Sequence, residues 1–158
     1  MVNIEIEMKN GDIIKAELYP EVAPITVENF TKLIGENFFD GLIFHRVIAG
    51  FMIQGGGFDE RGRHKEADSI LGEFSANGVE NNLKHERGVL SMARTMFPNS
   101  ASSQFFIMHK NAPHLDGEYA AFGKVTEGIE VVDKIAVCDT DYQDSPLEKQ
   151  VIKTIRLV

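Results

Sequence analysis

Strict alternation of apolar and polar residues near the start of the chain is the feature that most constrains its fold. Apolar side chains occupy every second position of Val2–Met8, and the pattern resumes over Ile14–Leu18. A period of two places successive side chains on opposite faces of a strand, and the intervening Asn10-Gly11 pair is typical of a tight turn. The chain is therefore predicted to open with a β-hairpin that buries one face.

Several later segments also have the composition of short strands. They are Phe44–Gly57, a short stretch near Ser69–Gly72, Gly88–Ala93, Gln104–Met108, Ala120–Val125 and Val151–Val158. Helical spacing of apolar residues predicts one helix that ends at Gly35 and a second over Ile129–Ala136. Many short strands with two separated helices favour a mainly β fold, an antiparallel barrel that is closed or nearly closed, with the helices covering its open ends.

The segment Phe44–Gly57, FHRVIAGFMIQGGG, is apolar but carries one arginine and one glutamine. Its pattern predicts two short strands joined by a bend at Gly50, and Gly55–Gly57 is predicted to be a turn rather than a phosphate-binding loop. An unpaired guanidinium in an apolar setting is very costly, so Arg46 must pair with an acid, point to water or line a groove. From the residues alone, a pair with a surface acid is the more frequent outcome.

Length and charge limit the class of protein. A chain of 158 residues that is 43% hydrophobic is long enough for one globular domain, here residues 1–158, with its own core. A net charge of −8 argues against nucleic-acid and membrane partners, because it repels phosphates and anionic lipids. The single cysteine, Cys138, excludes an internal disulfide, and no export signal or long apolar run is present. We expect a soluble cytoplasmic protein.

The Gln104–Met108 segment, QFFIM, is predicted to present an amide and an aromatic ring together. A period of two places Gln104 and Phe106 on one face of the strand, with Phe105 on the other. The polar connection from Phe58 to Glu86 is long for a compact domain, and we expect it to form part of the rim of a binding surface.

Four blocks of the sequence resemble the signature segments of cyclophilin-type peptidyl-prolyl isomerases, and they occur in the family's order. They read FHRVIAGFMIQGG, GVLSMAR, SSQFFIM and LDGEYAAFGKV, and they span Phe44–Val125. The predicted hairpin, helices and last strand also match the family layout. The resemblance implies a closed eight-stranded antiparallel barrel capped by two helices, with a groove on its outer surface. It also implies isomerisation of X–Pro bonds in unfolded or flexible polypeptides, which assists protein folding, without a cofactor or metal.

The resemblance also assigns roles to individual residues. It implies a catalytic role for Arg46, a proline pocket of Phe51, Met52, Phe106 and Leu115, polar positions at Gln54 and Gln104, and contact with the peptide backbone at Ala93 and Arg94. Three substrate-binding positions depart from the best-known pattern: His114 replaces tryptophan, Tyr119 replaces histidine, and Arg94 replaces asparagine. We therefore expect weak cyclosporin binding, because drug-sensitive members carry the tryptophan.

The implied chemistry needs no general base. Twisting an X–Pro bond breaks amide conjugation, at a barrier of about 18–20 kcal/mol, and returns a lone pair to the proline nitrogen. A cationic donor such as Arg46, aimed at that nitrogen, favours the twisted state over either planar one.

Less specific interpretations remain open. The pocket residues Phe51, Met52 and Phe106 have the composition of ordinary core, and Gln54 and Gln104 are nearly as readily structural amides. The histidines, His45, His64, His85, His109 and His114, show no metal-ligand spacing, and only His114 is placed to tune peptide affinity near neutral pH.

The sequence is also compatible with two other classes of function. In one, the groove binds proline-containing segments as a chaperone or adaptor, and catalysis is incidental. In the other, the barrel is a hydrolase or a small-molecule binder. Ser91, Ser102 and Ser103 are candidate nucleophiles of a triad with Asp116, but no nucleophile elbow surrounds any of them. The expected partners are proline-containing peptides and unfolded proteins, and we expect a monomer.

Overall fold

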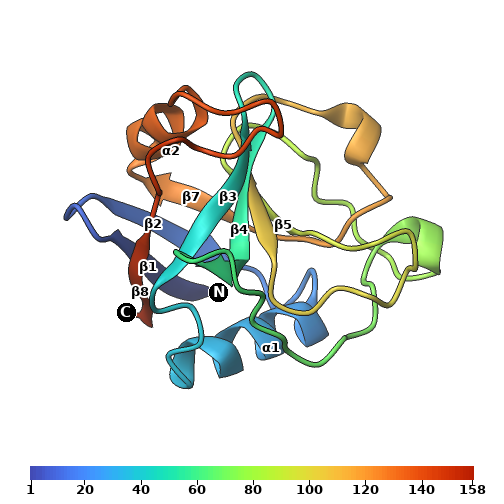
Figure 1. The fold of residues 1–158 in the computed structure, drawn as a ribbon. Helices are drawn as coiled ribbons and strands as arrows, with labels where there is room; N and C mark the ends of the chain where they lie inside the picture. The colour runs from blue at the N-terminus through green and yellow to red at the C-terminus, as the bar shows by residue number, and fades with distance from the viewer.

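The computed structural model describes residues 1–158, and its strands form one antiparallel sheet that rolls into a barrel (Figure 1). The eight strands are β1 (Val2–Met8), β2 (Ile13–Leu18), β3 (Leu42–Ile48), β4 (Met52–Asp59), β5 (Val89–Met92), β6 (Phe105–Met108), β7 (Ala121–Glu127) and β8 (Ile152–Leu157). Their order around the sheet is β3-β4-β6-β5-β7-β2-β1-β8. The predicted mainly β, eight-stranded barrel is therefore confirmed.

The barrel closes between its edge strands, β3 and β8, through fewer contacts than join the other neighbours. Ile43 and Val151 form a single bridge, and the Phe44 N–H donates to the Gln150 carbonyl at 2.9 Å. This seam lacks the continuous ladder of the other pairs, so the barrel is nearly closed rather than fully closed.

The first hairpin matches the prediction from alternation. β1 and β2 pair in antiparallel register from Val2 opposite Leu18 to Glu7 opposite Ile13. Gly11 takes a φ of +96° in the turn, a conformation that glycine adopts without strain. The alternating apolar residues face the core, whereas their neighbours remain partly exposed.

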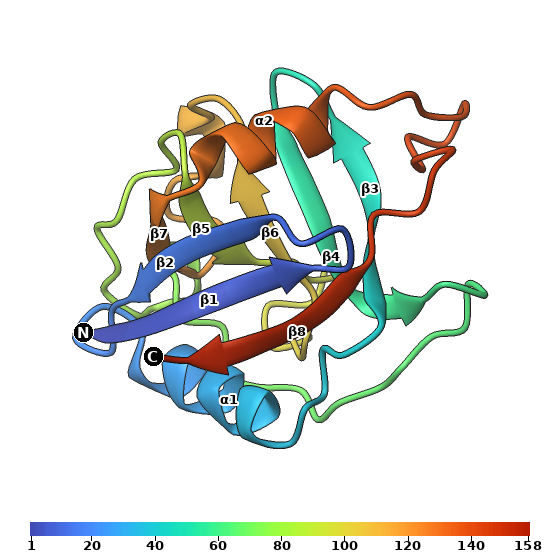
Figure 2. The same cartoon turned by 90° about the vertical axis from the view of Figure 1, so that its left-hand side faces the viewer.

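Two helices cover opposite ends of the barrel, α1 (Pro24–Gly35) and α2 (Ile129–Ala136). Figures 1 and 2 show α2 over one end and α1 beneath the other. Phe30 of α1 reaches into the barrel, where its ring lies 5.2 Å from that of Phe105 and 5.1 Å from that of Phe122. Two short 3₁₀ helices, η1 (Ser75–Asn77) and η2 (Pro113–Leu115), lie in the connections. None of the helices combines the length and apolarity needed to cross a bilayer.

Two local predictions are wrong. Ser69–Gly72 is not a strand, because it makes isolated bonds to the Ala101–Asn99 region instead of a ladder. Gly55–Gly57 is not a turn but continues β4. The glycines meet a packing requirement there: a Cβ on Gly55 would lie 2.6 Å from the Ile43 carbonyl oxygen, and one on Gly57 would lie 2.5 Å from the Gln104 side chain.

Candidate functional site

Side chains of β4, β5 and β6 alternate between the barrel interior and its outer surface. Phe105 and Ile107 belong to the core cluster of 31 buried residues. Phe106 and Met52 belong instead to a separate cluster of seven buried residues on the outer face. The division of faces predicted for QFFIM is confirmed, and Phe106 and Met52 are not part of the barrel core.

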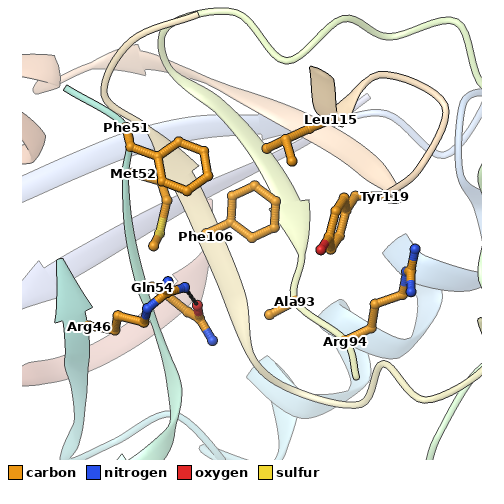
Figure 3. Close-up of a pocket in the computed structure, with 9 residues that line it drawn as sticks. All are labelled: Arg46, Phe51, Met52, Gln54, Ala93, Arg94, Phe106, Leu115 and Tyr119. Atoms are coloured by element: carbon orange, nitrogen blue, oxygen red, sulfur yellow. Dashed lines mark hydrogen bonds between the residues drawn. The ribbon is translucent and has the colours of Figure 1, made fainter. Parts of the chain in front are cut away.

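A pocket of about 310 Å³ opens over this outer cluster (Figure 3). Its lining residues are Arg46, Phe51, Met52, Gln54, Ala93, Arg94, Phe106, Leu115 and Tyr119. All of them are residues that the family resemblance implied. Of the other implied residues, Gln104 lies beside the pocket, hydrogen-bonded to Gln54, and His114 lies outside it, with its ring 5.8 Å from that of Phe51.

Arg46 is held at one edge of the pocket by a chain of amides. It lies opposite Gln54 in the β3–β4 register, and its Nη1 donates to Gln54 Oε1 at 3.4 Å. Gln54 Nε2 in turn donates to Gln104 Oε1 at 3.1 Å. Arg46 is exposed and takes part in none of the ion pairs of the chain. The pair with a surface acid that the residues alone favoured is not formed. Instead the guanidinium lines the pocket with its charge uncompensated, as the family resemblance implied.

A buried polar chain lies behind Phe106. Asp116 Oδ1 is 3.0 Å from His85 Nδ1, and His85 Nε2 is 2.9 Å from Ser91 Oγ. An ionised carboxylate only accepts, so Nδ1 carries the proton and Nε2 accepts from the Ser91 hydroxyl. The His85 ring also stacks on Phe106, with 6.0 Å between centroids. Burial lowers the pKa of His85, opposed in part by Asp116, so the imidazole is kept neutral.

This chain corrects one expectation about a hydrolase. Ser91, His85 and Asp116 do form a hydrogen-bonded row, although no histidine was expected beside Ser91 and Asp116. Ser91 is 0% exposed and His85 is 1% exposed, so the hydroxyl cannot reach a substrate. The three residues support the floor of the pocket instead. The signals in the sequence were Ser91, a hydroxyl within an apolar strand that requires a partner, and Asp116, but nothing in the spacing linked either residue to His85.

The Phe51 wall of the pocket is clamped by a histidine that the sequence did not single out. Gly50, at the β3–β4 bend with a φ of +82°, donates its N–H to His109 Nδ1 at 2.9 Å. The main-chain N–H of His109 donates to the Phe51 carbonyl, also at 2.9 Å. His109 Nε2 lies 3.1 Å from Asp133 of α2, which Arg87 binds through both carboxylate oxygens. Helix α2 thus fixes the pocket wall through His109.

The fold and site together define a class of protein. The pocket on the outside of the barrel has apolar walls and one uncompensated guanidinium at its edge. Such a site suits a compact apolar ring attached to a polar backbone, which is what proline presents in a peptide.

Comparisons with known proteins identify the family. The model of the cyclophilin type peptidyl-prolyl cis-trans isomerase/CLD family matches residues 1–157. A peptidyl-prolyl cis-trans isomerase of Acinetobacter baylyi is 44% identical, over 98% of this chain and 85% of its own. One of Schizosaccharomyces pombe is 42% identical, over 99% of this chain and 100% of its own. The chain belongs to the cyclophilin-type peptidyl-prolyl cis-trans isomerases, an isomerase family consistent with proline isomerisation in protein folding.

A solved structure agrees with this assignment. The crystal structure of a Cryptosporidium parvum cyclophilin type isomerase superposes with a TM-score of 0.83 at 32% identity, over 99% of this chain and 98% of the other. That crystal was studied in the presence of the dipeptide Ala-Pro. The resemblance found in the sequence blocks is confirmed.

Proposed function

We propose that the pocket over Phe106 is the site at which this chain isomerises X–Pro bonds in unfolded or flexible polypeptides. The observation that carries the proposal is the position of Arg46: a permanently charged donor without an acidic partner, at the edge of an apolar pocket. A pocket of about 310 Å³ has room for a proline ring and part of its neighbours.

The proposed mechanism divides the work between the pocket and the arginine. Met52, Phe106 and Leu115 hold the proline ring, while the preceding carbonyl rotates in the open groove beside Ala93. The proline nitrogen becomes pyramidal as the amide twists, and Arg46 donates to its returning lone pair. No bond forms or breaks, so no proton needs to be moved.

Magnitudes show that Arg46 does not act alone. An acceleration of about 10⁵-fold requires a barrier about 7 kcal/mol lower. A hydrogen bond from a charged donor contributes about 1.5–3 kcal/mol. The remainder is assigned to orientation of the peptide and exclusion of water, to which the Gln54–Gln104 amide pair contributes by fixing Arg46.

The test is a protease-free measurement of cis–trans exchange in a short X–Pro peptide by NMR. Wild type should accelerate exchange, and Arg46→Ala should lose about 10- to 100-fold while its circular dichroism and unfolding midpoint stay unchanged. Arg46→Lys is the matched control, because it keeps the charge but loses the planar fork, and it should fall between the two. A folded wild type that binds the peptide without accelerating exchange would make the protein a chaperone or adaptor.

Further properties belong to the same proposal. We expect weak cyclosporin binding, because His114 stands at the position where drug-sensitive relatives carry tryptophan. His114 is exposed and lies outside the pocket. We also expect a single-domain monomer, since one continuous core fills the barrel, and light scattering checks its mass. A cytoplasmic location is supported by Cys138, the single cysteine, which has no partner for an internal disulfide.

A further inference from the structure

The pocket is a positively charged site on a negatively charged protein. Arg46 and Arg94 lie at opposite rims (Figure 3), and no Asp or Glu is among the lining residues. The chain as a whole carries a net charge of −8. Neither arginine takes part in any ion pair of the chain. Although the chain has an excess of acidic residues, none of them forms an ion pair with Arg46 or Arg94.

Arg94 is fixed by groups that leave its charge intact. Its Nε and Nη2 donate to the Glu118 carbonyl at 3.2 and 2.7 Å, and its Nη1 donates to the Thr95 carbonyl at 2.9 Å. The Glu118 carboxylate forms no ion pair with it. A guanidinium has five N–H donors, so one hydrogen on each terminal nitrogen remains free for a ligand. Main-chain carbonyls orient the group without cancelling its charge.

Two aromatic rings also hold the Arg94 guanidinium. Its central carbon lies 4.7 Å from the Phe74 ring centroid and 4.7 Å from that of Tyr119. Phe74 is 2% exposed, so this contact partly removes the guanidinium from water. A half-buried, immobilised charge attracts an anion more strongly than a mobile surface lysine, because screening and lost side-chain entropy are both smaller.

The hollow beside the proline pocket is polar. It has a volume of about 160 Å³ and is lined by Gln54, Ala93, Arg94, Thr95, Ser100, Ser102 and Gln104. It shares Gln54, Ala93 and Arg94 with the proline pocket, so a peptide in one extends directly into the other. Its lining offers hydroxyls, amides and a guanidinium, and again no acid.

We propose that Arg94 selects substrates with an acidic side chain close to the proline, and that this side chain enters the polar hollow. The proposal rests on the proposed isomerase function and adds a substrate class to it. The acidic residue lies within about three positions of the proline, because an extended residue spans about 3.3 Å and the proline pocket itself reaches Arg94. Basic residues at these positions are disfavoured by Arg46 and Arg94 together.

The experiment compares matched peptides that carry Glu, Gln or Lys at each of the three positions before and after proline. Exchange of each is measured by NMR with wild type, and the uncatalysed rate is subtracted. At low salt, kcat/KM for the best Glu peptide should exceed that of its Gln partner by about two- to five-fold, and the Lys partner should be the poorest. The ratio should shrink as ionic strength rises.

Variants assign the preference to Arg94. Arg94→Gln should bring the Glu/Gln ratio close to one whatever its absolute rate, and Arg94→Lys should retain part of it. Lys15→Gln is the control for net charge, because Lys15 lies on β2, which pairs with none of β4, β5 and β6, and it should leave the ratio unchanged. A wild-type ratio of one, or a ratio that survives Arg94→Gln, overturns the proposal. Turnover of the Gln peptide separately tests the isomerase function, so the two failures are distinguishable.

Discussion

The inner and outer faces of β4, β5 and β6 differ in the kind of side-chain contact that they make. On the inner face, Phe105 packs its ring 5.2–5.9 Å from those of Phe30, Phe39 and Phe44, and its neighbours are apolar. On the outer face, apolar residues alternate with polar groups that each need a specific partner. Ser91 bonds to His85 there, and Gln54 bonds to Arg46 and Gln104.

The contrast shows how the same strands provide both the fold and the site. Apolar packing is tolerant of sequence and contributes most of the stability. A polar chain is worth little in net free energy but fixes atoms in position. We therefore expect inner-face changes to act on the free energy of unfolding, and outer-face changes to act on turnover.

The largest expected effect comes from a pair of neighbouring phenylalanines on opposite faces. Phe105→Ala should lower the free energy of unfolding by about 3–5 kcal/mol, because it leaves a cavity in the aromatic core. Phe106→Ala should cost less, since its cluster has seven residues and borders the pocket, but it should reduce kcat/KM more than 10-fold by removing the pocket floor. Denaturant unfolding and NMR exchange check both. Equal losses of stability with equal residual turnover would remove the distinction between the faces.

The next effect concerns two imidazoles, the partly buried His45 and the buried His85. Burial, with Arg46 and His64 nearby, lowers the pKa of His45 to about 4, and burial also lowers that of His85. In the unfolded chain both take up a proton below about pH 6.5, so the unfolded state binds more protons between pH 6.5 and 4. The free energy of unfolding should therefore fall over this range, by about 2–3 kcal/mol from His45 alone.

Urea unfolding at a series of pH values checks this dependence. His45→Gln keeps a polar side chain but removes the titrating group, so its stability should depend less steeply on pH. A slope as steep as that of wild type would show that His45 is protonated equally in both states.

The smallest expected effect sharpens the role of His109. His109→Asn places an amide oxygen near the position of Nδ1 and keeps the acceptor for Gly50, whereas His109→Gln reaches toward Asp133 and loses that acceptor. The Gln variant should raise KM about three- to five-fold through a displaced Phe51, and the Asn variant should stay near wild type. If His109→Asn raises KM as much as His109→Gln, then the contact of His109 with Asp133 matters for the pocket, and the hydrogen bond from Gly50 to His109 does not.

Most of the fold could be predicted because its signals are local. Alternation over Val2–Met8 and helical spacing over Ile129–Ala136 each require only neighbouring residues. The strand through Gly55–Gly57 was missed because its glycines are required by packing against other segments of the chain. The backbone of the neighbouring strand β3 approaches Gly55 closely, and the Gln104 side chain covers Gly57. No local pattern distinguishes that requirement from a turn.

The site divides in the same way. Family blocks locate every residue that lines the pocket, and a period of two separates Phe106 from Phe105. The supporting chains through His85 and His109 join residues far apart in sequence, so spacing gives no signal of them. The lack of an acid beside Arg46 is also a property of the folded surface. The residue pattern alone favoured an ion pair there, and only the family blocks indicated a place in the groove.

The most direct test of the account measures peptide affinity and catalysed exchange together in Arg46→Ala. NMR line shapes of a titrated X–Pro peptide give both the dissociation constant and the exchange rate of the bound peptide. Because Arg46 acts on the twisted state, exchange should fall about 10- to 100-fold while the dissociation constant rises less than about three-fold. Losses of equal size in both would contradict the account, since Arg46 would then bind the planar and twisted peptides alike.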